Sequence, residues 1–258
     1  MDLLSDLSPE DWQRQTLAPQ WKIKDVAAHL LDGNLRALSM LRDGYFDKQT
    51  PETDSYSDLV RYLNTLNADW VRAAKRLSPR VIIDMHRLSF KEYIDFLKTL
   101  HPEEQAVFSV AWAGEQESKN WFHIAREYTE KWHHQQQIRY AVGNESVLMT
   151  DEYFIPYLDT SLRALPHHYR DVSGDTGDVI KFTFTGASDK SWYLYYGEKW
   201  ELGDDMKEPC KCEVKIDDQV AWRIFTKGID RAEAIRRSEI VGQQVLGLKI
   251  FDMMAVMA

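Results

Sequence analysis

The spacing of apolar residues in the first part of the chain, to about residue 170, is typical of helices. In residues 21–44, apolar side chains recur every three or four positions and form the stripe of an amphipathic helix. The same period appears in residues 55–79, which close with a Ser-Pro pair, and in residues 79–102. Ser89 lies within the latter segment and is a predicted break of that helix. This part of the chain therefore predicts helices and no sheet.

A fourth helix is predicted over residues 118–143, with Ser118 as its N-terminal cap and Gly143 at its C-terminal end. Four such helices predict a bundle. Residues 151–172 have the pattern of one more helix, which Pro166 is expected to end before a glycine-rich run.

The period changes from helical to alternating after residue 175. Three segments alternate or are rich in aromatic residues, as strands are: residues 178–186, residues 191–203 with a turn at Gly197, and residues 210–218. They predict a small antiparallel sheet, with two helical pieces at 229–237 and 242–258 after it. Helices first and strands later predict an α+β chain of two domains, residues 1–150 and residues 151–258.

Composition and charge narrow the class of protein. The chain has 258 residues, of which 44% are apolar, and this is ample for a globular core. The formal net charge of -9 opposes a nucleic-acid partner, because phosphate binding needs clustered positive charge. The sequence has neither an apolar run that could cross a bilayer nor a signal-peptide pattern, so we expect a cytoplasmic protein without a membrane partner. Cys210 and Cys212 are too close for an easy disulfide and are expected to be structural thiols.

Glu130, His134 and Gln137 share one face of the fourth predicted helix, because residues three and four positions apart stack on a helix. The carboxylate and the imidazole point toward one position, and both are good ligands for zinc or nickel. His29, at the edge of the apolar stripe of the first predicted helix, is the best candidate for a third ligand. These residues predict a divalent metal site with an open position for water or substrate.

The same spacing has a second interpretation, in which the polar face of this helix is exposed to water. An apolar stripe lies nearly opposite Glu130 and His134 and consists of Trp121, Ala125, Tyr128 and Trp132. His133 points about a third of a turn away from His134, so the two are not expected to bind one ion. On spacing alone, both interpretations stay open.

Two segments that are distant in the sequence carry a resemblance to a known family. Residues 21–30 are WKIKDVAAHL, and residues 126–139 are REYTEKWHHQQQIR. Together they resemble the N-terminal domain of the mycothiol-dependent maleylpyruvate isomerase family, within the DinB-like metal-binding four-helix bundles. The resemblance implies that His29, Glu130 and His134 are the metal ligands.

This chain departs from the family pattern at two positions. The family often has an acidic residue where this chain has Gln137, and often Ser or Thr where this chain has Lys22. The first departure puts proton transfer by position 137 in doubt.

The resemblance extends to the C-terminal half. The matching segments are residues 162–172, 177–186, a W-x-L hairpin at 192–194, and residues 221–228 and 240–247. They are similar to the family's C-terminal domain, which has a sterol-carrier-protein-like α+β fold. The resemblance therefore implies that residues 151–258 comprise a linking helix and this smaller domain.

These observations lead to a hypothesis of function. The protein is expected to be a metal-dependent enzyme of low-molecular-weight thiol chemistry, either a thiol S-transferase or similar to maleylpyruvate isomerase. A metal-bound thiolate attacks an electrophilic small molecule, with zinc as the expected metal and nickel as the alternative. Gln137 is expected to hydrogen-bond a metal-bound group, and Arg237 to hold a substrate carboxylate.

Two other functions stay open at this point. A metal-bound water as nucleophile would make the protein a hydrolase. A non-enzymatic small-molecule-binding protein would use the aromatic segment 191–200 to line a pocket, although aromatic residues in a small sheet more often pack in a core. The expected assembly is a monomer or a homodimer.

Overall fold

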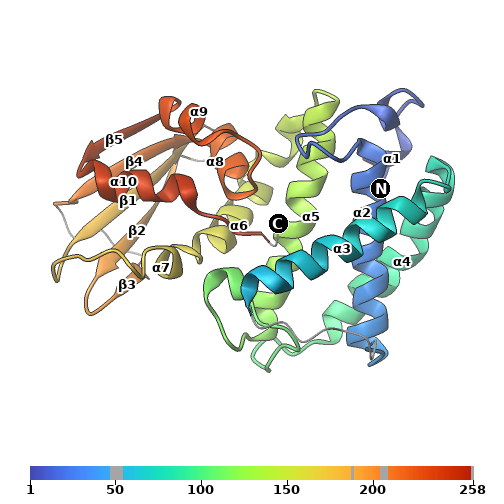
Figure 1. Cartoon of the computed structure of the whole chain (residues 1–258), viewed down its shortest axis with the longest axis horizontal. Coiled ribbons are helices and arrows are strands. Elements are labelled where there is room, and N and C mark those ends of the chain that lie inside the picture. The colour runs from blue at the N-terminus through green and yellow to red at the C-terminus, as the bar shows by residue number, and fades with distance from the viewer. Residues whose placement is uncertain (47–54, 187–188, 204–208, 257–258) are drawn as a thin grey trace.

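The computed structural model describes residues 1–46, 55–186, 189–203 and 209–256. A helical N-terminal part is followed by a five-stranded sheet with further helices (Figure 1). The α+β class predicted from the sequence is confirmed.

Four long helices form the N-terminal part: α2 Ile23–Ala37, α3 Tyr56–Ala74, α4 Pro79–Thr99 and α5 Asn120–Ala141. The short helix α1 Asp2–Ser5 and a 3-10 turn at Asp11–Gln13 precede them. A π-helical turn, Leu38–Arg42, extends α2. α3, α4 and α5 each pack against α2, which is therefore the central helix of the bundle.

The starts of α3 and α4 follow local sequence signals. The hydroxyls of Ser55 and Ser78 accept hydrogen bonds from the first-turn backbone N–H groups of Asp58 and Val81. Pro79 then occupies the first turn of α4, where its missing N–H has no helical partner to lose. Local capping chemistry therefore sets where these two helices begin.

Two details of the helix prediction are wrong. α4 runs unbroken through Ser89, which is buried between helices, where its hydroxyl accepts a hydrogen bond from Asn34 at 3.4 Å. Ser118 does not cap α5, whose N-cap is Lys119. The Ser118 hydroxyl instead accepts a hydrogen bond from the backbone N–H of Val110 at 2.8 Å and so fixes the preceding loop.

A 3-10 turn at Ala111–Ala113 precedes α5. The chain between α5 and the sheet contains a 3-10 turn at Glu145–Leu148, α6 Asp151–Leu162 and α7 Leu165–His168. The single helix predicted over this last segment is therefore divided in two. Pro166 does not end a helix but lies in the first turn of α7, which is a position that tolerates proline.

The sheet has the strand order β3-β2-β1-β4-β5. Its strands are β1 Val179–Thr185, β2 Lys190–Tyr196, β3 Trp200–Gly203, β4 Cys212–Asp217 and β5 Ser238–Gly242. Neighbouring strands are antiparallel except β1 and β4, which are parallel and pair Phe182 with Val214. The expectation of an antiparallel sheet is corrected for this pair, because alternation predicts a strand but not the direction of its neighbour.

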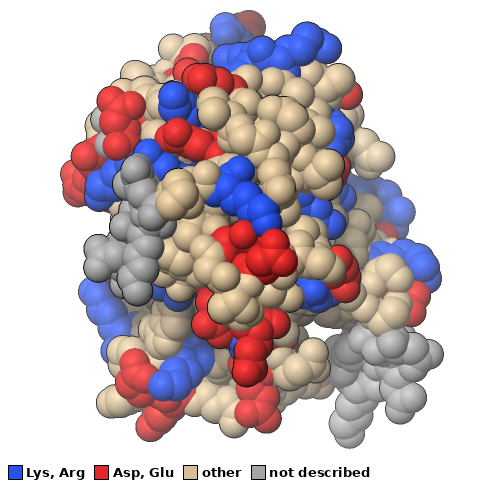
Figure 2. Space-filling model, turned by 90° about the vertical axis from the view of Figure 1, so that its left-hand side faces the viewer, with Lys and Arg blue, Asp and Glu red and all other residues tan. Residues whose placement is uncertain are grey.

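Three helices accompany the sheet: α8 Asp218–Phe225, α9 Arg231–Arg236 and α10 Gln244–Leu248, with a 3-10 turn at Lys249–Asp252. α8 and β5 were not predicted from the sequence. Basic and acidic side chains are interspersed on the face that this part of the molecule presents in Figure 2.

Two hydrophobic cores hold the fold together. The smaller core joins the start of α2 to α1, α4 and the end of α5, as Ile23, Ile82 and Ile138 illustrate. The larger core contains the buried face of the sheet together with α6, α8 and Trp132 of α5. α5 therefore lies between α6 on one side and α2 on the other (Figure 1). The larger core contains residues from both sides of residue 150. This core therefore does not mark a domain boundary there, and the boundary stays a prediction.

Cys212 is a buried free thiol at the start of β4, and Cys210 is half-buried just before that strand. Among the described residues, none of the helices combines the length and the apolar character needed to cross a bilayer.

Candidate metal centre

His29 of α2 and Glu130 and His134 of α5 converge on one point inside the bundle. The Nε2 atoms of His29 and His134 lie 3.0 and 3.1 Å from the same carboxylate oxygen, Oε1 of Glu130. One ligand atom from each residue lies within 4.8 Å of the others. Ligands at about 2.0–2.2 Å from a tetrahedral zinc ion lie roughly 3.3 Å from one another, so the three groups are close enough to share one ion.

Both helices bury the residues that form this cluster. His29 and His134 are 7% and 6% exposed, whereas the Glu130 side chain is 32% exposed and gives the cluster contact with solvent. The interpretation of this α5 face as solvated is wrong, because α2 covers it while α6 covers the opposite face.

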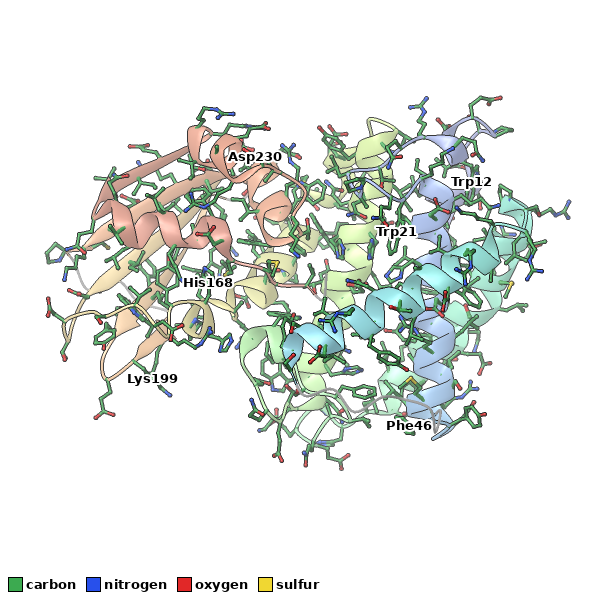
Figure 3. All side chains as sticks on the ribbon, viewed as in Figure 1. Trp12, Trp21, Phe46, His168, Lys199 and Asp230 are labelled. Carbon is green, nitrogen blue, oxygen red and sulfur yellow. The ribbon has the colours of Figure 1, made fainter. Side chains whose placement is uncertain are left out.

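Trp21 completes the walls of the cluster just before α2 begins. Its ring centre lies 4.8 Å from that of His29 and 5.9 Å from that of His134. Figure 3 places Trp21 beside α5 and Trp12 and Phe46 at opposite ends of α2. The indole thus shields both imidazoles on one side.

The protonation states of the cluster suit a cation. Burial lowers the pKa of His29 to about 4, so its imidazole is neutral at pH 7. Burial by itself raises the pKa of Glu130, but the interaction with His134 and the hydrogen bonds from both histidines hold it well below its ordinary value. A neutral imidazole and a carboxylate are donors that zinc-like ions bind.

Gln137 fixes the orientation of His134 from the far side of the ring. Its Oε1 lies 2.9 Å from Nδ1 of His134 and can only accept, so Nδ1 carries the proton. The other ring nitrogen of His134, Nε2, faces the carboxylate of Glu130 at 3.1 Å. Two acceptors at this distance repel each other unless a proton or a metal ion lies between them, and this observation fits a bound cation.

Two neighbouring polar residues do not join the cluster in the same way. His133 is buried with its ring centre 3.9 Å from that of His134, but its Nδ1 donates to the Thr129 carbonyl at 3.3 Å. Gln137 contacts a ligand residue and is a positioning residue in this arrangement, so its expected contact with a metal-bound group stays a prediction.

Arg237 lies at the C-terminal end of α9, in the other half of the molecule (Figure 1). Its guanidinium is 3.9 Å from the Glu233 carboxylate, and the part of the chain that the structure describes gives it no contact with His29, Glu130 or His134. Its role toward a substrate carboxylate stays a prediction.

A polar network that sequence reasoning missed continues along the same face of α5. The Tyr93 hydroxyl donates to Glu127 at 2.7 Å, and Arg126 donates to the other oxygen of Glu127 at 2.9 Å. Lys131 extends toward α2, and burial lowers the pKa of its ammonium while Glu127 and Glu130 oppose the shift. The sequence signal was available, since Glu127 and Lys131 are spaced one turn apart beside Glu130.

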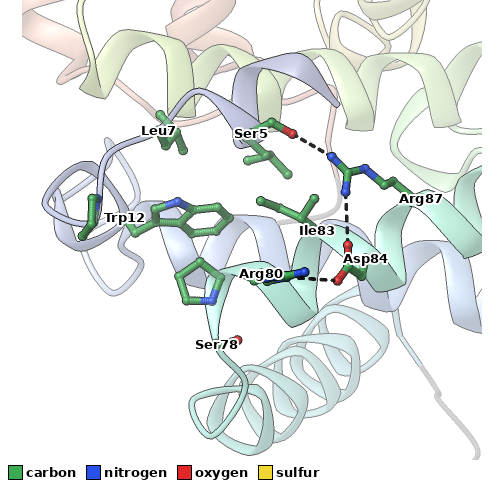
Figure 4. Close-up of a pocket in the computed structure, with 11 residues that line it drawn as sticks. Ser5, Leu7, Trp12, Ser78, Arg80, Ile83, Asp84 and Arg87 are labelled. Carbon is green, nitrogen blue, oxygen red and sulfur yellow. Dashed lines mark hydrogen bonds and ion pairs between the residues drawn. The ribbon is translucent and has the colours of Figure 1, made fainter.

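Two cavities lie near this part of the fold, and neither contains a triad residue. One of about 610 Å³ lies between the N-terminal segment and the start of α4, with Trp12 and Ile83 as its apolar wall (Figure 4). Its two arginines, Arg80 and Arg87, are both ion-paired with Asp84.

A second cavity of about 300 Å³ borders α5 and includes Arg139. Neither of these two cavities is lined by the aromatic segment 191–200. Leu194 and Trp200 of that segment are instead core residues.

The protein without metal is expected to lose stability as the pH falls from about 7 to about 4. In the unfolded chain His29, His123 and His133 take up protons near pH 6.5, whereas burial lowers their folded pKa values to about 4, about 4 and about 3. Acidification therefore favours the unfolded state, so this contribution is complete above pH 6.5 and is lost as the pH falls toward the folded values.

Because each unit of pKa shift corresponds to about 1.4 kcal/mol, the free energy of unfolding should fall by on the order of 3 kcal/mol or more. Urea denaturation of chelator-treated protein at about pH 7 and about pH 4.5 measures it. Equal free energies of unfolding at the two values would contradict the neutral, buried state of these imidazoles.

Residues 1–139 match the family described as mycothiol maleylpyruvate isomerase N-terminal domain. No curated protein matches the sequence. Among solved structures, one described as "UbiJ-SCP2 Ubiquinone synthesis protein" is similar at 17% identity and a TM-score of 0.26, over 38% of this chain and 85% of that chain.

The family match includes α2, α3, α4, α5 up to Arg139, and every residue of the triad. It also spans more than half of the 258 residues and confirms the resemblance carried by residues 21–30 and 126–139. The chain therefore belongs to the mycothiol maleylpyruvate isomerase N-terminal domain family, and its bundle is of the DinB-like metal-binding kind.

Proposed function

We propose that the protein is a metal-dependent enzyme that joins a low-molecular-weight thiol to an electrophilic small molecule, or isomerises such a molecule through the thiol adduct. His29, Glu130 and His134 hold the divalent ion, with zinc first and nickel second by ligand preference. The observation that carries this proposal is the approach of two imidazole Nε2 atoms to one oxygen of Glu130, from segments a hundred residues apart.

The residues around the triad have separate tasks in this proposal. Glu130 supplies the anionic ligand and is the exposed member through which solvent and substrate reach the cluster. Gln137 holds the Nδ1 proton of His134 and keeps Nε2 directed at the centre. Trp21 shields the imidazoles on one side.

A bound divalent ion of this type favours the thiolate form of a thiol at neutral pH, which supplies the nucleophile without a protein cysteine. Cys210 and Cys212 lie in and next to β4, and burial raises the pKa of Cys212 to about 11, so neither is needed. With a chloronitroarene as electrophile, the sulfur–carbon bond forms, chloride leaves and the thiol proton passes to solvent.

Metal analysis and a thiol-dependent assay test this function. Protein purified without chelator or metal-affinity resin should contain about one transition-metal ion per chain. The metal-loaded protein should then accelerate the reaction of 1-chloro-2,4-dinitrobenzene with cysteine or 2-mercaptoethanol above the rate measured with metal-free protein. Turnover that is indifferent to thiol would favour a hydrolase with water as nucleophile, and a protein without bound metal would overturn the proposal.

A further inference from the structure

Lys131 lies next to both segments that form the triad. It follows Glu130 on α5, and its Nζ donates to the carbonyl of Leu30 at 3.4 Å, while Leu30 itself follows His29. The ammonium also lies 4.9 Å from the centre of the Tyr93 ring. The long hydrogen bond leaves most of its donor capacity unused.

Gly33 provides the room for this ammonium on α2. It lies one turn after His29, and a Cβ at this position would be 3.3 Å from Lys131 Nζ. Glycine within a helix lowers its stability relative to alanine, and Gly33 does not have the positive φ that would require glycine. The close approach of Lys131 is therefore the physical reason for glycine that the structure offers.

The carboxylates around Lys131 are already engaged by other groups. Glu127 accepts hydrogen bonds from Tyr93 and Arg126, and Asp32 pairs with Arg36 at 2.9 Å. Glu130 faces the two triad histidines. Within the described chain, Lys131 itself forms no ion pair.

An ammonium that is packed between helices and ion-paired with none of the carboxylates around it is costly unless a ligand supplies the pairing charge. A divalent ion held by the single carboxylate of Glu130 leaves a further positive charge beside it. Both features attract an anion to this point of the bundle.

We propose that Lys131 is the anion-binding residue of this site, and that a reactant at the triad carries a carboxylate that pairs with its ammonium. This inference rests on the proposed function, because it assigns the carboxylate to one of the two reactants. The carboxylate belongs either to the thiol or to the electrophile, and both sources share the same contact with Lys131.

The Gly33 amide offers a local probe for the test. Zinc-loaded, ¹⁵N-labelled protein is titrated with propionate in the presence of 2-mercaptoethanol, and separately with 3-mercaptopropionate. A saturable shift of the Gly33 amide by propionate assigns the carboxylate to the electrophile, and one by 3-mercaptopropionate alone assigns it to the thiol. Zinc content is measured on each sample, so that loss of the metal, which would end the proposed function, is distinguished from loss of anion binding.

Lys131→Met should retain zinc and weaken carboxylate binding at least tenfold, because it keeps the length of the side chain and removes the charge. Arg139→Met is the matched control, since it removes one positive charge from the same helix about two turns after Lys131, and both side chains border the cavity of about 300 Å³. It should change the affinity less than twofold. Equal affinity in wild type and Lys131→Met would overturn the proposal, and so would equal losses in the two variants.

Gly33→Ala is a second variant that does not depend on Lys131→Met folding. Alanine favours the helix, but its Cβ displaces the ammonium from its position against α2. Carboxylate binding should weaken about threefold while thermal stability is kept. Unchanged binding in this variant together with a displaced Lys131 side chain would contradict the assignment.

Discussion

Replacement of His29 by alanine is expected to abolish stoichiometric zinc binding at micromolar concentrations. Structural zinc sites contribute about 10–16 kcal/mol, so losing one of three protein ligands removes roughly 4 kcal/mol and weakens binding about a thousandfold. Competition with a chromogenic zinc chelator measures the dissociation constant, and elemental analysis counts the bound ion. Circular dichroism establishes that the variant is folded.

His133→Ala is the matched control for this experiment. His133 is also buried, and it adjoins His134 in the sequence and in space, but its Nδ1 donates to the Thr129 carbonyl at 3.3 Å. Its removal should change zinc affinity by no more than about threefold, because the three triad groups remain. Equal losses in the two variants would show that the site depends on general packing rather than on His29 as a ligand.

The pairing of Glu130 with His134 could be predicted from spacing, but the environment of their face could not. A single amphipathic stripe assigns one buried side to a helix, and on α5 the stripe of Trp121 and Trp132 identified the side toward α6. α2 packs on the other side, so the polar face is buried as well. The choice of His29 as a third ligand, and then the family resemblance, indicated that a second helix lies there.

The elements that sequence analysis missed have weak local signals. β5 is an edge strand with the sequence SEIVG, and most of its residues are exposed or half-buried, so it lacks the alternation of a strand with one buried face. α8 has eight residues, close to the limit at which a helical period is detectable. The parallel pairing of β1 with β4 is set by tertiary packing, which local alternation does not encode.

The position of Trp132 links the metal centre to the sheet. Trp132 lies between Glu130 and His134 in the sequence, yet its ring points to the opposite face of α5 and stacks on Tyr157 at 4.0 Å between ring centres. It also meets Trp222 of α8 edge-on at 6.1 Å. The helix that supplies two of the three triad residues is therefore held from behind by the larger core, and the two halves of the chain should not be independent in stability.

Trp132→Ala is accordingly expected to destabilise the C-terminal sheet as well as the bundle. Truncation of a buried tryptophan, here 2% exposed, costs about 3–5 kcal/mol. Native-state hydrogen exchange should show faster exchange at the amides of Phe182 in β1 and Val214 in β4, although both lie outside α5.

Trp70→Ala on α3 is the control, since the Trp70 indole donates to the Ala28 carbonyl within the bundle. This substitution should leave the exchange rates of the two strand amides unchanged. Strand amides that exchange at the wild-type rate in Trp132→Ala would instead favour two domains that unfold separately at the boundary near residue 150.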